Sequence, residues 1–215
     1  MKKNIGVIGS GMVGKALASG FVKYGYNVMI ASNDPAKRKD LSETLQGITT
    51  GSFEDSAKFG ETIVLAVKGS AAEEVVKQLG KNYFKGKIIL DTTNPIAEVP
   101  PVKGVLQYFT PMNESLMERL QKLAPEAKFV KAFSCVGAAF MVDPDFGGVK
   151  PTMFVCGNDA GAKHETSGIL EQFGWDTEDM GDAESARAIE PLAMLWCIPG
   201  IRENRWTHAF KLLKL

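Results

Sequence analysis

The sequence predicts a doubly wound α/β fold with a mainly parallel sheet, followed by a small, largely helical C-terminal part. Short apolar segments rich in β-branched residues alternate with helical segments up to residue 135, which is typical of a buried parallel sheet. After Ala138 this texture changes, and residues 143–148 have the composition of a loop. We therefore expect two parts, residues 1–150 and residues 151–215.

The individual elements follow from the positions of the apolar runs and the breaks between them. In the first part we expect strands at residues 4–8, 27–31, 62–67, 87–91 and 129–133, and helices at 12–24, 35–46, 54–58, 70–80 and 113–123. Asp34 as N-cap and Pro35 in the first turn mark the second helix. In the second part we expect strands at 152–156 and 175–177, a helix at 160–173, and a helical stretch from 184 to about 215, interrupted at Pro199 and Gly200.

Composition excludes several classes of function. Lysine and arginine number 25 and so do aspartate and glutamate, so no net charge favours nucleic acid or an anionic membrane. Three cysteines without a CxxC pair argue against a disulfide framework and for a reducing cytoplasm. The sequence contains no run of 18 apolar residues, so we predict no membrane span. Lys2 and Lys3 before an apolar run imitate a signal peptide, but the glycines of that run favour another interpretation.

Those glycines form a loop between the first strand and the first helix, with the sequence Gly-Ser-Gly-Met-Val-Gly at residues 9–14. In a dinucleotide-binding Rossmann fold, the first glycine allows a tight turn, the second admits the pyrophosphate, and the third lets helix and strand pack closely. The anion then lies at a helix N-terminus, where free N–H groups attract it. We expect cofactor contacts from Gly9, Ser10, Gly11, Met12, Val13 and Gly14.

The end of the second strand favours NADP over NAD. An NAD site usually carries a carboxylate for the ribose 2′-hydroxyl about 20 residues past the loop, whereas this chain has Ser32 and Asn33. Lys37 and Arg38 follow one turn later and are suited to a 2′-phosphate. The alternative for this basic run is a solvated helix face.

Other strand ends supply the remaining candidate residues, because ligands of doubly wound sheets lie outside the carboxyl ends of the strands. We expect cofactor contacts there from Ala66, Val67, Lys68, Asn94, Pro95 and Ser134. Lys68 is equally well explained as an exposed loop lysine, and Asn94-Pro95 as a turn. Cys135 fits a small core residue better than a nucleophile, since no histidine lies near it in the sequence.

No catalytic residue or metal site stands out from the sequence. His164 and His208 lie in expected helices without a second ligand at metal-binding spacing. Arg187 and Glu190 have the spacing of a surface ion pair on a helix. Leu192, Leu195 and Trp196 form a stripe too apolar for the surface of a monomer, which predicts a homodimer or a role in closing an acceptor cleft.

Several segments in order along the chain resemble the NADPH:deazaflavin-coenzyme oxidoreductase family, and equally the cytosolic reductase domain of six-transmembrane metalloreductases. These segments are the glycine loop and residues 91–95, 130–133, 154–159, 179–181 and 186–192. The resemblance implies hydride transfer between NADPH and a flavin or 5-deazaflavin carrier. It also implies that Ser10, Ser32 and Asn33 hold the 2′-phosphate, although the family commonly has arginine at the last position.

Two further departures leave the acceptor open. The deazaflavin enzymes have a histidine where Ser134 stands, and the metalloreductases use a membrane haem domain that is not part of this sequence. The sequence thus predicts an NADP-dependent oxidoreductase with a small-molecule redox acceptor. A reductase of small carbonyls or imines and a dinucleotide sensor without turnover remain as alternatives.

Overall fold

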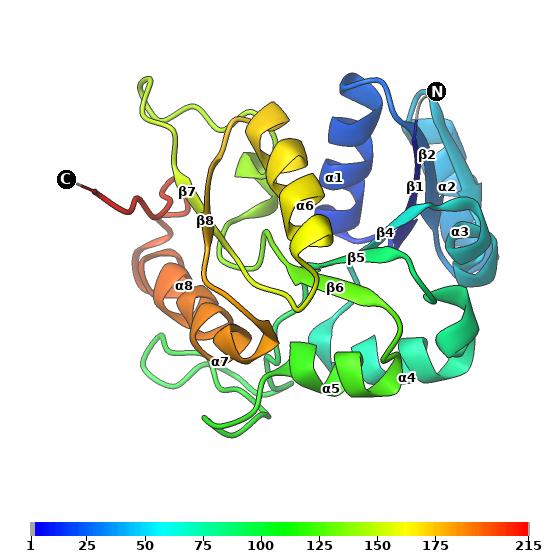
Figure 1. The fold of residues 1–215 in the computed structure, drawn as a ribbon. Helices are drawn as coiled ribbons and strands as arrows, with labels where there is room; N and C mark the ends of the chain where they lie inside the picture. Colours follow the sequence, from blue (N-terminus) through cyan, green and yellow to red (C-terminus); the bar gives the residue numbers. More distant parts are fainter. Residues whose placement is uncertain (1–2, 215) are drawn as a thin grey trace.

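Six parallel strands form the main sheet of the computed structural model, which describes residues 3–214 (Figure 1). Their order is β3-β2-β1-β4-β5-β6, so the chain reverses its direction of winding between β1 and β4. The strands are β1 (Asn4–Ile8), β2 (Asn27–Ala31), β3 (Ile48–Gly51), β4 (Thr62–Leu65), β5 (Ile88–Asp91) and β6 (Lys128–Lys131). This arrangement confirms the predicted doubly wound Rossmann fold.

Helices cover both faces of this sheet (Figure 1). They are α1 (Met12–Lys23), α2 (Pro35–Thr44), α3 (Phe53–Phe59), α4 (Gly69–Leu79), α5 (Leu116–Leu123) and α6 (Ala160–Gln172). Apolar side chains of α1, α2 and α6, such as Phe21, Leu41 and Leu170, form one buried cluster with the sheet. Side chains of α3, α4 and α5, such as Val76 and Leu120, form another. The continuous apolar runs of the strands are explained by this burial on both faces.

Local signals set where most helices begin. The Asp34 side chain accepts a hydrogen bond from the Ala36 amide, with Pro35 in the first turn, as the sequence predicts. Ser115 and Glu118 form a capping box at the start of α5. Because Ser115 is the N-cap, α5 begins at Leu116 and not at the expected residue 113.

Other strand positions differ from those expected, because contacts with distant parts of the chain set them. The sequence analysis assigns no element to Ile48–Gly51, yet these four residues pair with β2 as the edge strand β3. Only one large aliphatic side chain occurs in this segment, so alternation is too weak to indicate a strand. In the second part, β8 (Asp176–Asp179) lies later than the expected strand at residues 175–177.

The C-terminal part continues the same core. Its two strands, β7 (Thr152–Val155) and β8, form a separate parallel pair. The Lys131 amide donates to the Cys156 carbonyl oxygen at 3.0 Å and thereby joins β6 to the end of β7. Trp175 lies in the same buried cluster as Phe21 of α1. A division near residue 150 stays a prediction, since apolar contacts run across it.

The prediction for the terminal helices is wrong in two respects. After α7 (Ala186–Ile189), helix α8 (Pro191–Glu203) continues through Pro199, because an internal proline removes one hydrogen bond without necessarily ending a helix. The helix stops at Asn204, which has a left-handed φ of 54°. Residues 204–214 are not helical and return along β7, where the Thr152 amide donates to the Phe210 carbonyl oxygen at 2.8 Å. Leu215 lies outside the described residues.

This returning segment also changes the interpretation of the apolar stripe on α8. Trp196 is buried against Gly137, stacks on His208 with ring centroids 5.0 Å apart, and exchanges two 2.8 Å hydrogen bonds with that residue. Leu195 alone of the three stripe residues is mostly exposed, at 56%. The premise of an exposed stripe is therefore wrong, and the homodimer stays a prediction. Within residues 3–214 no helix is long and apolar enough to cross a bilayer.

Candidate dinucleotide-binding site

The glycine loop connects β1 to α1, and its three glycines occupy three different environments. Gly9 has a φ of 124°, and a Cβ atom there would lie 2.3 Å from the Ala66 carbonyl oxygen. A Cβ atom on Gly14 would lie 2.1 Å from the Gly9 carbonyl oxygen. At Gly11 a Cβ atom would have no neighbour within 4 Å. The turn, the close packing and the open approach expected of the loop are thus all present.

A cavity of about 590 Å³ lies beside this loop, outside the carboxyl ends of β4 and β5. Of the predicted residues, Val13, Ala66, Val67, Lys68 and Asn94 line it. The sequence analysis missed the other lining residues, which are Gly69, Ser70, Thr92, Thr93, Ile96, Ala97, Glu98, Val99 and Pro100. The cavity lies next to the reversal between β1 and β4, where doubly wound sheets bind their ligands.

Two loops meet closely at the floor of this cavity. A Cβ atom on Gly69 would lie only 1.8 Å from the Asn94 carbonyl oxygen, so any other residue at this position would push the loops after β4 and β5 apart. A glycine directly after an apolar strand and Lys68 is the sequence signal for this contact. Lys68 itself is exposed, and its ammonium group lies 3.9 Å from Glu98 at the cavity rim.

Asn94 and Ser134 come together as neighbouring strand ends should. The Asn94 side-chain amide donates to the Ser134 carbonyl oxygen at 2.7 Å. Its Oδ1 atom and the Ser134 hydroxyl are buried without a hydrogen-bond partner among the described residues. Buried polar atoms usually have a partner, so both are suited to a polar ligand group. Pro95 instead starts the following hairpin, where its carbonyl oxygen accepts from the Phe109 amide.

The residues after β2 differ in whether they reach the end of that strand. Asn33 is held by α3, since its Oδ1 atom accepts from the Phe53 amide at 3.1 Å. Arg38 reaches back to the strand end, where Nη1 donates to the Ser32 carbonyl oxygen at 2.8 Å. Lys37 is exposed on the outer surface of α2. Arg38 is therefore the cation that the fold brings to the end of β2.

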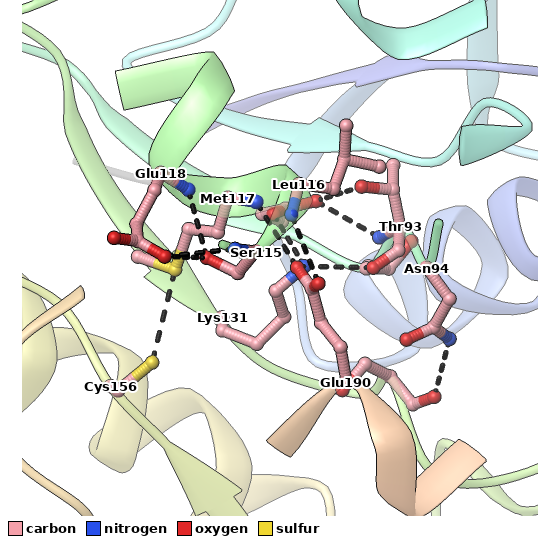
Figure 2. A network of polar contacts seen from close by, with 12 residues as sticks. Thr93, Asn94, Ser115, Leu116, Met117, Glu118, Lys131, Cys156 and Glu190 are labelled. Atoms are coloured by element: carbon pink, nitrogen blue, oxygen red, sulfur yellow. Dashed lines mark hydrogen bonds and ion pairs between the residues drawn. The ribbon is translucent and has the colours of Figure 1, made fainter. Parts of the chain in front are cut away.

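A buried charged cluster, which sequence reasoning missed, adjoins Thr93, one of the residues that line the cavity (Figure 2). The Lys131 ammonium group lies 2.7 Å from Asp91 and 2.8 Å from Glu190, and donates to the Thr93 carbonyl oxygen at 2.8 Å. The charged side chains are at most 2% exposed. Burial lowers the pKa of Lys131, but the two carboxylates outweigh this and hold it above its ordinary value. A lysine within an apolar strand was the available signal, because buried charges need partners.

The expected surface pair of Arg187 and Glu190 is wrong. Glu190 is buried and accepts hydrogen bonds from the Leu116 and Met117 amides at the start of α5, at 3.0 and 3.1 Å. Arg187 pairs instead with Glu118, with Nε 2.9 Å from Oε2. The i,i+3 spacing failed because α5, which is distant in sequence, packs against α7 and supplies partners to both residues.

Acid–base chemistry has few candidates near the cavity. Its lining contains neither histidine nor tyrosine nor cysteine among the described residues. Cys135 is buried, and burial raises the pKa of its thiol to about 12, consistent with the expected core role. Residues 3–214 contain no group of three or more histidine, cysteine, aspartate or glutamate side chains arranged to hold a metal ion.

The Glu118–Arg187 pair predicts a specific loss of stability in acid. The hydrogen bond from Arg187 lowers the pKa of Glu118 from 4.5 to about 2, so the pair contributes fully above about pH 5 and is lost as the pH falls towards 2. We expect the free energy of unfolding of Arg187→Gln to change less with pH than that of the parent below about pH 5. Urea unfolding of both proteins between pH 7 and pH 3 measures it. If the free energies of unfolding of the two proteins fell equally with pH, Arg187 would not be the group that lowers the pKa of Glu118.

Comparison with known proteins places this geometry in a family. The profile of the family described as NADP oxidoreductase, coenzyme F420-dependent, matches residues 4–95. A crystal structure of a candidate F420-dependent NADP reductase from Arthrobacter sp. FB24 is 30% identical, and the match covers all of both chains with a TM-score of 0.91. The chain belongs to this family. The description of this family names NADP oxidoreductases.

The chain is also similar to longer proteins. Rat metalloreductase STEAP3 is 31% identical over 200 residues, which are 91% of this chain and 38% of the relative. Human metalloreductase STEAP2 is 27% identical over 90% of this chain and 36% of its own length. The chain thus spans little more than a third of the length of these relatives.

Proposed function

We propose that this protein is an NADP-dependent oxidoreductase, which binds NADPH along the carboxyl edge of its sheet and transfers a hydride between the nicotinamide and a flavin or 5-deazaflavin carrier. The observation that carries this proposal is the continuity of the site. Gly11 leaves the glycine loop open to a ligand, and Val13 of the same loop lines the 590 Å³ cavity at the reversal of the sheet. The family description, which mentions coenzyme F420, supports a carrier of this kind.

Each part of the site has a role in this proposal. Free amides at the start of α1 bind the pyrophosphate, and Arg38 with Ser32 binds the 2′-phosphate. Asn94 Oδ1 and the Ser134 hydroxyl accept and donate hydrogen bonds at the nicotinamide end. Apolar side chains such as Val67, Ile96 and Val99 exclude water from the cavity and orient flat rings against each other.

The few titratable groups of the cavity favour transfer between two redox cofactors. Lys68 and Glu98 are the ionisable side chains in its lining, and both lie at the exposed rim. Reduction of a carbonyl or imine needs a positioned proton donor, whereas the nicotinamide and the carrier supply the hydride chemistry themselves when bound. The protein then acts by binding and orientation.

The test is NADPH oxidation measured against FMN, FAD, coenzyme F420, a ferric chelate, a cyclic imine and a small ketone. We expect turnover with a flavin or deazaflavin, and losses of less than about a hundredfold in Lys68→Ala, Asn94→Ala and Ser134→Ala, because loss of an acid–base group costs about 10²–10⁴-fold. A loss of a thousandfold or more in one variant at unchanged NADPH affinity would instead identify a proton donor. The proposal would then yield to a carbonyl or imine reductase.

Discrimination between NADPH and NADH depends, in this proposal, on Arg38. We expect Arg38→Ala to weaken NADPH binding about tenfold or more and to leave NADH binding nearly unchanged, since a charge-assisted hydrogen bond contributes about 1.5–3 kcal/mol. Lys39→Ala is the matched control, because Lys39 lies on the same helix and pairs with Glu43. Titration calorimetry with both cofactors at fixed salt measures the change. Equal losses for the two cofactors would exclude Arg38 from the phosphate site.

A further inference from the structure

The buried cluster of Asp91, Lys131 and Glu190 touches the cavity through Thr93. We propose that this charged cluster is a positioning device for the nicotinamide end of the cofactor, an inference that rests on the proposed function. It fixes the turn of Thr93 and Asn94, which lines the cavity, and it ties that turn to the hairpin that follows. Three connections carry the argument, and Figure 2 shows the residues Thr93, Lys131, Glu190, Leu116 and Met117 of the first two.

The first connection joins the cluster to Thr93. Asp91 and Lys131 are the last residues of β5 and β6 and are register partners, so their side chains leave the sheet on the same side. Asp91 Oδ1 accepts from the Thr93 amide at 2.9 Å and from its hydroxyl at 2.7 Å. Lys131 donates to the Thr93 carbonyl oxygen. All three polar groups of Thr93 are therefore held by charged side chains, and Asn94 is the next residue.

The second connection runs through Glu190 to α5. Its carboxylate lies 2.8 Å from the Lys131 ammonium group and is itself fixed by the Leu116 and Met117 amides. These amides belong to a helix N-terminus, which favours a negative charge. Glu190 therefore sets the position of Lys131, which contacts no substrate and acts through Thr93.

The third connection reaches the hairpin that follows Asn94 and Pro95. The Tyr108 hydroxyl donates to the Glu190 carbonyl oxygen at 2.7 Å, and Tyr108 bridges to Ile96 across the hairpin that follows Pro95. Ile96 lines the cavity. Glu190 is thus bonded through its side chain to Lys131 and through its main-chain carbonyl oxygen to the hairpin that carries Ile96.

Stability alone gives no reason for such a cluster. Replacing buried ion pairs by apolar side chains of similar volume is often neutral or stabilising, because burying charges has a large desolvation cost. Charged hydrogen bonds are directional, however, and all three polar groups of one turn are held here. This geometry is suited to keeping Asn94 in one place relative to a bound ring.

The test compares two ligands that share one end. NADPH occupies the whole site, whereas 2′,5′-ADP lacks the nicotinamide and reaches only the glycine loop and the end of β2. We expect Glu190→Gln to weaken NADPH binding about tenfold or more, equivalent to about 1.4 kcal/mol, with 2′,5′-ADP affinity changed less than about twofold on the same scale. Arg187→Gln is the matched control, because Arg187 joins α7 to α5 without contacting a strand end. It should change neither affinity.

A second variant keeps the inference testable if Glu190→Gln folds poorly. Thr93→Val removes the hydroxyl bond to Asp91 without leaving a charge unpaired, and should give the same selective loss on a smaller scale. A variant that loses both ligands equally, or neither, would overturn the positioning role. A parent protein that binds NADPH no more tightly than 2′,5′-ADP would overturn the proposed function itself.

Discussion

Gly11→Val is expected to reduce NADPH affinity at least about a hundredfold, equivalent to about 2.7 kcal/mol, while the protein remains folded. A side chain at this position meets no protein atom within 4 Å, so the fold has room for it, and Gly11 has a φ of −76°, which valine adopts readily. The space that valine fills is the space through which the pyrophosphate must approach the amides of α1. Calorimetric titration and thermal unfolding together measure both parts of this expectation.

The control for this substitution is Gly168→Val. Gly168 lies in α6, away from the loop, and a side chain there also meets nothing within 4 Å. We expect parental NADPH affinity from this variant. The expected loss of stability in Gly11→Val is about 1 kcal/mol, as for other changes at an N-cap. A Gly11→Val protein that binds NADPH like its parent would show that the loop is not the pyrophosphate site.

Lys131→Met should produce the largest loss of stability. It leaves Asp91 and Glu190 buried together without a cation, and breaking a buried ion pair from one side costs about 3–5 kcal/mol. Lys122→Met is the matched control, since Lys122 pairs with Glu114 at an exposed position and should cost less than about 1 kcal/mol. Urea unfolding at pH 7 gives both values.

A neutral version of the cluster separates charge pairing from packing. In Asp91→Asn/Lys131→Met/Glu190→Gln no buried charge is left unpaired, so we expect this triple variant to recover part of the stability lost by Lys131→Met. A triple variant less stable than the single one would mean that the hydrogen bonds of the carboxylates, and not their pairing with Lys131, dominate the free energy of unfolding.

Local signals made the glycine loop predictable. The pattern lies within six consecutive residues, and the contact that excludes a side chain at Gly14 is with Gly9 of the same loop, although the contact at Gly9 is with Ala66 after the neighbouring strand β4. The cap at Asp34 is predictable for the same reason. Cofactor positions at strand ends could also be inferred, because parallel strands bring their carboxyl ends to one edge. Val67 and Asn94 therefore line the same cavity although they lie on different loops.

Local sequence patterns fail to predict a contact when the partner residue comes from a distant part of the chain. Arg187 and Glu190 have the spacing of a surface pair, but α5 separates them by offering each a different partner. The edge strand β3 carries too few apolar residues to be recognised, and exists because β2 offers it a hydrogen-bonding edge. The hairpin wall of the cavity was missed as well, since its position depends on Tyr108 reaching Glu190.

The sequence by itself determined the doubly wound fold class, the dinucleotide loop and the absence of a carboxylate at the end of the second strand, because hydrophobic periodicity and glycine spacing are properties of the sequence. Tertiary structure alone decided how charges and apolar surfaces are paired. Lys131 is a stable buried cation only because Asp91 and Glu190 converge on it, and Trp196 is covered only because the C-terminal segment returns across α8. Desolvation makes both arrangements depend on partners that no local pattern can name.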